Sequence, residues 1–434
     1  MEGHGTEGED PRPEGKSEKI MTHEEKMIVG LTGCSHALTH GYLLIFPAVL
    51  LLLKEEFSMG YLGLGIISNI MNFTYGLGAL PGGMIYNRMG PRRLFLLCFL
   101  GSALAALLVA FSPNYIFFTI GLAILGALGS VYHPLANSLI TAKVEAYGKA
   151  LGIHGAAGNI GVASTPFIAA LVASHWGWRQ AYICFAAPGI IVSIWSLLID
   201  MSMEGRKKEE DSPAAIPPLT SAGVKSFWIY FSIPLVLLYI NNLLNSFCYH
   251  GIITFLPTYM AQRTSFHIFS WDNVAIGGML SGVALVMGAF GQYAGGLLGQ
   301  KPHLTRNLLI MTAMGFPFIL AMSLTTDFFL LLVSVIYFFF TFCLQPMTNV
   351  LLAHYTTLEM RGTSYGIYFF AAFGIGSLAA SFCGYLAQNF GLQWAFLGLS
   401  GTAFILIIFT YLLLRVEGRK QKAVVGQASR LSKQ

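Results

Sequence analysis

Charged side chains are scarce in this chain of 434 residues, because Asp, Glu, Lys and Arg together make up only 10% of it. Soluble domains contain about 25% charged residues. Hydrophobic residues make up 55% of the chain, and the mean hydropathy is +0.64. So few charges cannot cover a surface that faces water, so most of the surface is expected to face lipid. The shortage excludes the soluble domains that the length alone would suggest.

Cysteine is also sparse. The six cysteines are scattered along the apolar segments, with no Cys-x-x-Cys pair, so we expect reduced, packed thiols rather than disulfides or a metal cage. The sequence contains no nucleotide-binding loop, no His-Glu-x-x-His motif and no convincing Ser/His/Asp arrangement, which argues against an enzyme. No cofactor and no resident metal are expected, and no cleavable signal peptide is visible.

Long apolar segments are what the sequence does contain. A helix needs about 20 apolar residues to cross a bilayer, and the segments that qualify are 27–53, 61–86, 93–111, 115–140, 150–173, 180–200, 227–259, 273–299, 306–324, 328–352, 363–388 and 393–415. The pattern predicts an all-α membrane protein of twelve transmembrane helices. The expected units are a disordered tail (1–26), a six-helix bundle (27–200), a linker (201–226), a second six-helix bundle (227–415) and a second tail (416–434).

Basic residues are distributed unequally between the two sides of this bundle. Of the 25 Lys and Arg residues, all except Lys54, Arg179 and Arg263 fall on one side. Cytoplasmic loops carry the basic excess in membrane proteins. We therefore expect both termini in the cytoplasm and the protein in the cell inner (plasma) membrane. The excess then reflects topology and not nucleic-acid binding, and nothing in the sequence requires more than a monomer.

The two halves of the chain repeat each other. His40 lies seven residues before Pro47, and His250 lies seven residues before Pro257. A second pair of matching runs is His133-Pro134-Leu135-Ala136-Asn137 and Gln345-Pro346-Met347-Thr348-Asn349. Two parallel copies of six helices are typical of transporters that rock one half against the other around a site near the bilayer midplane.

A motif follows the second apolar segment, and it reads Gly82-Gly83-Met84-Ile85-Tyr86-Asn87-Arg88-Met89-Gly90-Pro91-Arg92-Arg93. This run resembles the cytoplasmic loop signature of the major facilitator superfamily, with Asn87 in place of the usual Asp. Glycine lets helices approach closely, and arginine can bond the carbonyl groups at helix C-termini. The expected conformational latch consists of Gly83, Asn87, Arg88, Gly90, Arg92 and Arg93.

Other residues of the first half resemble the fosmidomycin-resistance branch of that superfamily: Ser35-His36, Pro47, Glu56-Phe57-Ser58, Tyr132-His133-Pro134 and the glycines Gly155, Gly158 and Gly161. The resemblance implies a twelve-helix, proton-driven exporter of drugs or metabolites. His40 and Leu135 stand where that branch has acidic residues, so the acidic proton carriers of the branch are missing here.

Histidines are therefore the titratable groups left near the middle of the expected spans. Their unperturbed pKa of about 6.5 lets them change charge near neutral pH, and ionisable groups inside a membrane usually mark pathways. His36 and His40 are four residues apart and share a helical face. The expected substrate and proton pathway consists of His36, His40, His133, Asn137, His154, Asn245, His250, Gln345 and Asn349.

Plainer interpretations of these residues stay open. His154 alone could simply hydrogen-bond a neighbouring helix, and His40 and His250 could serve packing. The repeated proline could produce only a helix kink. The spacing of Gly155, Gly158 and Gly161 is typical of close helix packing.

The sequence predicts a secondary transporter of a small organic solute, an exporter coupled to protons through histidine. Without Arg or Lys in the cavity, the two negative charges of an obligate dianion would have no positive charge to pair with. Without acidic residues, strongly cationic drugs are disfavoured as well. A neutral, amphipathic or weakly anionic solute fits best, with protons and the lipid bilayer as the other partners. Two alternatives are a transition-metal transporter, because imidazoles suit divalent metals, and a transporter-like sensor that moves no solute.

Overall fold

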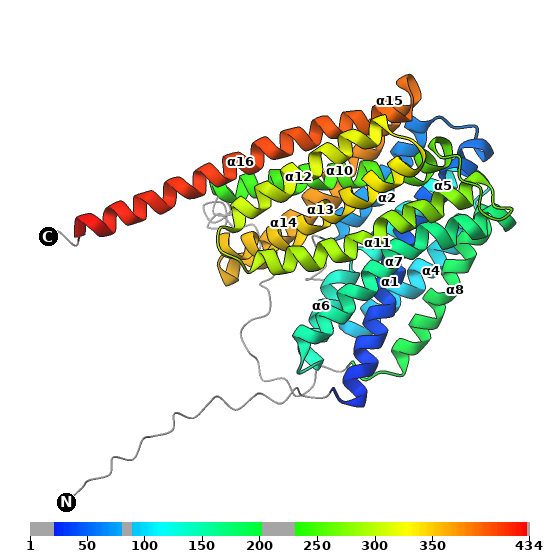
Figure 1. Cartoon of the computed structure of the whole chain (residues 1–434). Coiled ribbons are helices and arrows are strands. Elements are labelled where there is room, and N and C mark those ends of the chain that lie inside the picture. Colours follow the sequence, from blue (N-terminus) through cyan, green and yellow to red (C-terminus); the bar gives the residue numbers. More distant parts are fainter. Residues whose placement is uncertain (1–20, 80–88, 202–230, 432–434) are drawn as a thin grey trace, which may run out of the picture.

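The structure, a computed structural model, describes residues 21–79, 89–201 and 231–431, and the regular elements in these ranges are all helices (Figure 1). The first half contains α1 (His23–Glu56), α2 (Tyr61–Ala79), α4 (Pro91–Ala110), α5 (Tyr115–Gly129), α6 (Tyr132–Lys143), α7 (Tyr147–Trp176) and α8 (Trp178–Leu197). The second half contains α10 (Ile233–Arg263), α11 (Asn273–Gly299), α12 (Leu304–Leu324), α13 (Asp327–Tyr355), α14 (Leu358–Phe369), η2 (Phe370–Ile375), α15 (Leu378–Phe390) and α16 (Leu392–Leu431). The expected all-α fold is confirmed.

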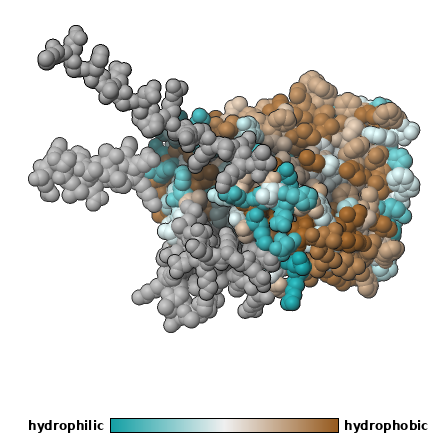
Figure 2. Space-filling view, turned by 90° about the horizontal axis from the view of Figure 1, so that it is seen from below, coloured by the Kyte–Doolittle hydropathy of each residue, from teal (hydrophilic) through white to brown (hydrophobic). Residues whose placement is uncertain are grey.

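Most of these helices are suited to a membrane. Within the described ranges, 10 helical stretches are long and apolar enough to cross a bilayer, and Figure 2 shows a broad hydrophobic band on the surface with hydrophilic residues gathered toward its ends. α2 and α10 fall outside that group of stretches. Both helices carry buried polar residues, among them Asn72 in α2 and Asn241, Asn242 and His250 in α10. The two helices that fall outside the group of apolar stretches, α2 and α10, therefore carry polar side chains that are buried in the protein.

Two of the expected spans are interrupted. The chain leaves the helix between α5 and α6, where Pro134 has no N–H to donate to the carbonyl of Ser130. The other expected span passes through the π-helical turn η2, after which the N–H of Gly376 donates to the carbonyl of Ala371 at 2.9 Å, a wider spacing than in an α-helix. Single π-helical turns occur frequently at functional sites. Pro346, the repeat partner of Pro134, lies inside the continuous helix α13.

Capping residues determine where several helices begin. Before α1, the N–H of Glu25 donates to Thr22 Oγ1 at 3.2 Å, and the N–H of Thr22 donates to Glu25 Oε2 at 2.8 Å. This reciprocal pair satisfies two backbone donors that the helix itself leaves free. The side chains of Asn114 and Asp272 cap α5 and α11 in a simpler way.

The two halves meet along glycine-lined seams, α2 against α15 and η2, and α7 against α11. A Cβ added at Gly65 of α2 would lie 2.2 Å from the carbonyl oxygen of Ala380 in α15. One added at Gly278 of α11 would lie 2.4 Å from the carbonyl oxygen of Pro166 in α7. Small residues at these positions let the backbones touch, as in other membrane helix pairs.

Hydrogen bonds join the halves at one end of the molecule, which we call the joined end. There α1 and α10 end and α2 begins. Gln262 Nε2 of α10 donates to the hydroxyl of Tyr61 at 2.9 Å, and the N–H of Leu62 in α2 donates to Gln388 Oε1 of α15 at 3.1 Å. Toward the opposite end, where α1 begins and α6 ends, the helices of the two halves diverge (Figure 1). We call that end the splayed end.

Candidate functional site

Four histidines of the first half form a cluster, which we call the histidine cluster: His36 and His40 of α1, His133 of α6 and His154 of α7. The rings of His36 and His154 are stacked, with centroids 4.1 Å apart and planes 15° from parallel. The ring of His133 meets that of His36 edge-on, with centroids 5.0 Å apart. The Nε2 atoms of His36 and His40 are 3.1 Å apart. The predicted pathway histidines of the first half are therefore in mutual contact.

A specific feature of each helix brings its histidine into the cluster. His36 and His40 share a face because they are one helical turn apart. His133 arrives at the first turn of α6, just beyond the break that precedes Pro134. α7 comes close because of Gly158, where a Cβ would lie 2.4 Å from Cε1 of His36.

The next glycine of the α7 spacing, Gly161, faces the backbone of α1, where a Cβ would lie 2.3 Å from the carbonyl oxygen of Ala37. Gly155 has nothing within 4 Å of such a Cβ. Two of the three glycines thus serve helix packing, as the spacing indicated, and the packing they allow holds the imidazoles together.

The hydrogen bonds assign protons within the cluster. His36 Nδ1 lies 2.8 Å from the carbonyl oxygen of His154. Because a carbonyl oxygen only accepts, Nδ1 of His36 carries the hydrogen, and in the neutral ring Nε2 keeps a lone pair. His40 Nε2 therefore donates to His36 Nε2. Nδ1 of His154 is buried without a hydrogen-bond partner.

The surroundings of the cluster are neutral. Tyr132, next to His133, packs its ring 5.8 Å from that of His36 and donates its hydroxyl to the carbonyl of Thr32. Ser35 and Thr39 donate to carbonyl groups of their own helix. In the described part of the chain, the salt bridges Lys143–Asp200 and Arg179–Glu56 involve the ends of helices and not this interior.

Three of the imidazoles could also approach a metal ion, since one nitrogen each from His36, His40 and His133 lies within 4.8 Å of the others. No Cys, Asp or Glu of the described residues joins this group. Three neutral imidazoles alone would leave a divalent cation with its full charge inside the membrane, which is costly.

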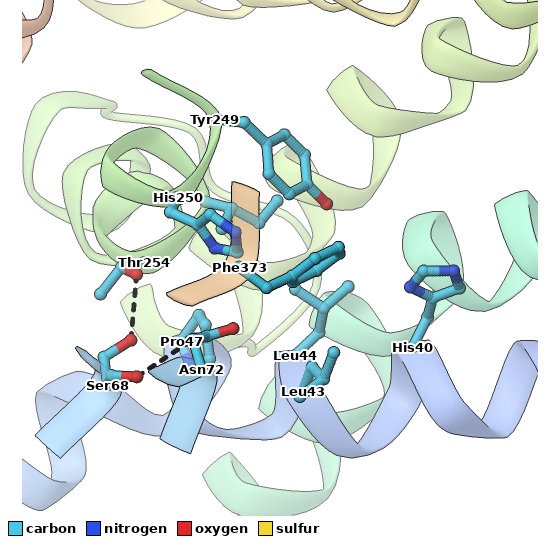
Figure 3. Close-up of a pocket in the computed structure, with 11 residues that line it drawn as sticks. His40, Leu43, Leu44, Pro47, Ser68, Asn72, Tyr249, His250, Thr254 and Phe373 are labelled. Atoms are coloured by element: carbon cyan, nitrogen blue, oxygen red, sulfur yellow. Dashed lines mark hydrogen bonds between the residues drawn. The ribbon is translucent and has the colours of Figure 1, made fainter. Parts of the chain in front are cut away.

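A small cavity of about 40 Å³ lies between the halves and connects His40 to the second half (Figure 3). Its remaining lining comes from α1, α2, α10 and η2: Leu43, Leu44, Pro47, Ser68, Asn72, Tyr249, His250, Ile253, Thr254 and Phe373. In Figure 3, Phe373 lies between His250 and the side chains of α1. The repeat-matched pair His40 and His250 thus lines one cavity from its two sides.

Polar groups on the floor of this cavity are engaged with each other. The hydroxyl oxygens of Ser68 and Thr254 are 3.2 Å apart, which joins α2 to α10. Asn72 Nδ2 donates to the carbonyl of Ser68 at 2.9 Å. One turn away, Asn69 Nδ2 donates to Ser377 Oγ at 2.8 Å. Of these two asparagines of α2, Asn69 therefore joins helices and Asn72 lines the cavity.

A chain of carboxamides crosses between the halves nearer the splayed end. Asn159 Nδ2 of α7 donates to Gln292 Oε1 of α11 at 2.5 Å, and Gln292 Nε2 donates to Gln345 Oε1 of α13 at 3.1 Å. Gln345, a predicted pathway residue, is exposed. It reaches the first half through Gln292 rather than through the histidines.

The other predicted pathway residues lie apart from the histidine cluster. Asn137 is exposed on α6. Asn245 Oδ1 accepts a hydrogen bond from Thr341 Oγ1 at 3.1 Å inside the second half, beside a separate pocket between α10, α12, α13 and α16. The Oδ1 atom of Asn349 is buried without a hydrogen-bond partner.

Three of the six residues of the expected latch, Gly90, Arg92 and Arg93, lie within the described part of the chain. Gly83, Asn87 and Arg88 lie outside the described residues. Gly90 has a φ of 74°, which favours glycine, and it begins α4 together with Pro91. Arg92 donates from Nη2 to the carbonyl of Ile199, just past the end of α8, at 3.0 Å. Arg93 is exposed.

Several site residues were missed by sequence reasoning. Gln292 and Asn159 carried a signal that could have been read, because each is an amide inside an apolar helix. Tyr249 and Phe373 carried none, since aromatic residues are common throughout the spans and the π-helical turn leaves no mark in the hydropathy pattern.

Comparison with known proteins agrees with this architecture. The D-galactonate transporter of Escherichia coli O6:H1 is 23% identical over 397 residues, covering 83% of this chain and 89% of that protein. The probable L-galactonate transporter of Escherichia coli K12 is 26% identical, but the match spans only 34% of this chain and 33% of that protein. A bacterial homolog of the human lysosomal transporter Spinster, in an inward-facing and occupied conformation, aligns with a TM-score of 0.75 at 15% identity over 91% of this chain and 97% of that chain.

The family assignment rests on a family model that matches most of the chain. The Major Facilitator Superfamily model matches residues 31–381, which include the histidine cluster and the cavity. The related proteins are transporters and not enzymes. This multi-pass membrane protein belongs to the major facilitator superfamily.

Proposed function

We propose that this protein is a proton-coupled secondary transporter of a small, neutral to weakly anionic organic solute. The observation that carries the proposal is the histidine cluster, four imidazoles grouped in the first half, of which His40 lines the cavity between the halves. A proton taken up by this cluster creates a single positive charge inside a neutral interior. That charge would bind a monoanion or orient a polar group of a neutral solute.

Coupling follows from the cost of burying an uncompensated charge. An anion entering the cavity without a proton, or a protonated cluster without an anion, leaves one charge unpaired inside the membrane. The proton and the anion together leave none. The halves would therefore rock most readily when both sites are filled or both are empty, which is the condition for coupled movement.

The names of the relatives support an organic anion as the solute, because galactonate is a carboxylate. Export, antiport and drug resistance rest only on the resemblance to the fosmidomycin-resistance branch, whereas the coupling described above moves the proton and the anion in the same direction and is therefore symport. The direction of transport stays a prediction. Cytoplasmic termini, a location in the inner membrane and a monomeric state also stay predictions, and the first of these rests on the basic excess.

The metal-transporter alternative draws on the same imidazoles, but it lacks an anionic ligand among the described residues. The sensor alternative predicts binding without flux. Both are separated from proton-coupled transport by a flux measurement.

The test uses purified protein in proteoliposomes with an imposed pH gradient and a panel of labelled monocarboxylates that includes D-galactonate and benzoate. We expect flux that follows the gradient, and we expect His36→Gln and His40→Gln to abolish this dependence. His175→Gln is the matched control, because His175 is exposed and its ring hydrogen-bonds the carbonyl of Leu171 in its own helix. Unchanged gradient-driven flux in both cluster variants would overturn histidine coupling.

A further inference from the structure

The wall of the cavity opposite the histidine cluster is aromatic. Phe373 of η2 packs its ring 5.3 Å from that of His250 and 5.0 Å from that of Tyr75, measured between centroids. Tyr249 of α10 lies 5.9 Å from Phe342 in the same measure. In Figure 3 the rings of Tyr249 and Phe373 stand on the side of the cavity that belongs to the second half, and His40 stands on the other.

The cavity therefore has two chemically different sides. One side can hold a single positive charge on an imidazole. The other side presents ring faces and edges beside the imidazole of His250, and such rings attract other aromatic rings by more than the area they bury. A solute that spans the cavity would need one anionic end and one flat apolar end.

Part of the polar lining between these sides is already hydrogen-bonded. Ser68 and Thr254 bond each other, and the amide nitrogen of Asn72 is committed to a backbone carbonyl. A polyhydroxylated chain would bring several hydroxyl groups to a place where Oδ1 of Asn72, the hydroxyl of Tyr249 and the ring nitrogens of His40 and His250 are the remaining polar atoms, and a buried hydroxyl without a partner is costly. An aromatic ring makes no such demand.

The cavity is too small for a ring in this conformation. It measures about 40 Å³, whereas an apolar cavity that binds benzene measures about 150 Å³. Phe373 is the side chain placed to make room, because it is half-buried and sits on the π-helical turn.

We propose that the solute is a planar aromatic monocarboxylic acid, with its carboxylate at His40 and its ring against Tyr249 and Phe373. This inference rests on the proposed function, since it names the substrate class of the same site. The carboxylate uses the one charge that the cluster can supply, and a second carboxylate on the ring would meet no Lys or Arg among the residues that line the cavity.

Benzoate is the probe, with cyclohexanecarboxylate, benzamide and D-galactonate as comparison solutes. In proteoliposomes containing the full chain, we expect proton-driven benzoate flux and weaker flux of cyclohexanecarboxylate. Benzamide should fail for lack of a charge, and D-galactonate should fail for lack of hydroxyl partners. Binding of the same solutes to detergent-purified protein is measured by calorimetry, which needs no transport.

Phe373→Leu removes the ring but keeps an apolar side chain. We expect it to raise the KM for benzoate about 2- to 12-fold, the factor that corresponds to the loss of one aromatic pair, and to leave the KM for cyclohexanecarboxylate nearly unchanged. Phe328→Leu is the control, because Phe328 is 57% exposed at the start of α13. Equal effects on both solutes would overturn the aromatic contact.

The two proposals can fail separately. If D-galactonate moves with protons, depends on the cluster and is preferred to benzoate, the aromatic class is wrong and the proposed function stands. If benzoate binds calorimetrically and loses affinity in Phe373→Leu, but no solute moves with protons, the aromatic site stands and the proposed function is wrong.

Discussion

The Nε2 atoms of His36 and His40 lie 3.1 Å apart, one turn apart on the same face of α1, and share a single hydrogen. The other nitrogen of His36 donates its hydrogen to the carbonyl of His154. An additional proton can settle on Nδ1 of His40, which keeps a lone pair, without breaking this contact, or on a neighbouring ring. Histidines coupled in this way take up protons as a group, and the facing titratable groups are His133 and Tyr132 of α6 and His154 of α7.

This arrangement predicts how solute affinity depends on pH. If one proton enters with one monoanion, the Kd of a monocarboxylate should rise about tenfold per pH unit once the cluster is mostly neutral. Affinity is then highest at low pH and falls as the pH rises. Calorimetry on purified protein from pH 5.5 to about 8.5 measures the slope around the ordinary histidine range. A Kd independent of pH in the wild type, or the same slope in His40→Gln, would contradict the prediction.

Gly158→Ala should disable transport without removing a polar group. Its Cβ would lie 2.4 Å from Cε1 and 2.5 Å from Nδ1 of His36, so either the imidazole or α7 must move, and the bond to the carbonyl of His154 is lost. We expect flux to fall about 5- to 150-fold, because removing a bond and its alignment costs about 1–3 kcal/mol.

Gly155→Ala is the matched control for this change. Gly155 lies one turn away on α7, and a methyl group added there would have nothing within 4 Å. Alanine also favours the helix more than glycine does. Gly155→Ala should keep wild-type flux and equal or greater thermal stability. Similar losses of flux in the two variants would show that α7 is merely sensitive to substitution.

The sequence predicted those parts of the molecule that depend on local pattern. Hydropathy runs indicate helices because a membrane requires about 20 apolar residues in a row, and a spacing of four places His36 beside His40. That histidines would be the titratable groups of the interior followed from composition alone.

Long-range packing decided the rest. His154 joins the cluster only because Gly158 leaves room for the ring of His36, and no local sequence pattern predicts this contact. Asn245 was assigned to the pathway, yet it bonds Thr341 inside the second half, because the rotation of α10 sets which of its polar side chains face the cavity. The sequence did not predict the π-helical turn that carries Phe373. Such a turn changes the hydrogen-bond spacing along the helix but leaves the hydropathy of the segment unchanged.

Asn242 is expected to hold that turn. Its Nδ2 donates at 2.8 Å to the carbonyl of Tyr368, two residues before η2 begins. Asn242→Ala leaves a buried carbonyl without this partner, which costs about 1–3 kcal/mol, and it lets η2 relax so that Phe373 turns away from the cavity. We expect a lower melting temperature and a several-fold loss of solute affinity.

Its neighbour supplies the comparison. Asn241 Nδ2 donates to Thr410 Oγ1 at 2.5 Å on the other side of α10, away from η2. Asn241→Ala should lower the melting temperature as well but leave solute affinity near the wild-type value. A loss of affinity of the same size in Asn241→Ala would show that general destabilisation, and not the turn, explains the result.

The joined end is expected to act as a gate that opens when the halves rock. Gln262 and Gln388 each supply one hydrogen bond across it, to Tyr61 and to the N–H of Leu62. The double variant Gln262→Ala/Gln388→Ala should destabilise the conformation in which the joined end is closed by about 2 kcal/mol. The ratio of open to closed molecules should then rise about 30-fold. Spin labels at positions 55 and 269, in a background with the exposed Cys34 and Cys184 replaced by alanine, would report longer distances. Asn389→Ala, whose side chain bonds only its own helix at Tyr385, should leave the distances unchanged, and unaltered distances in the double variant would rule out this gate.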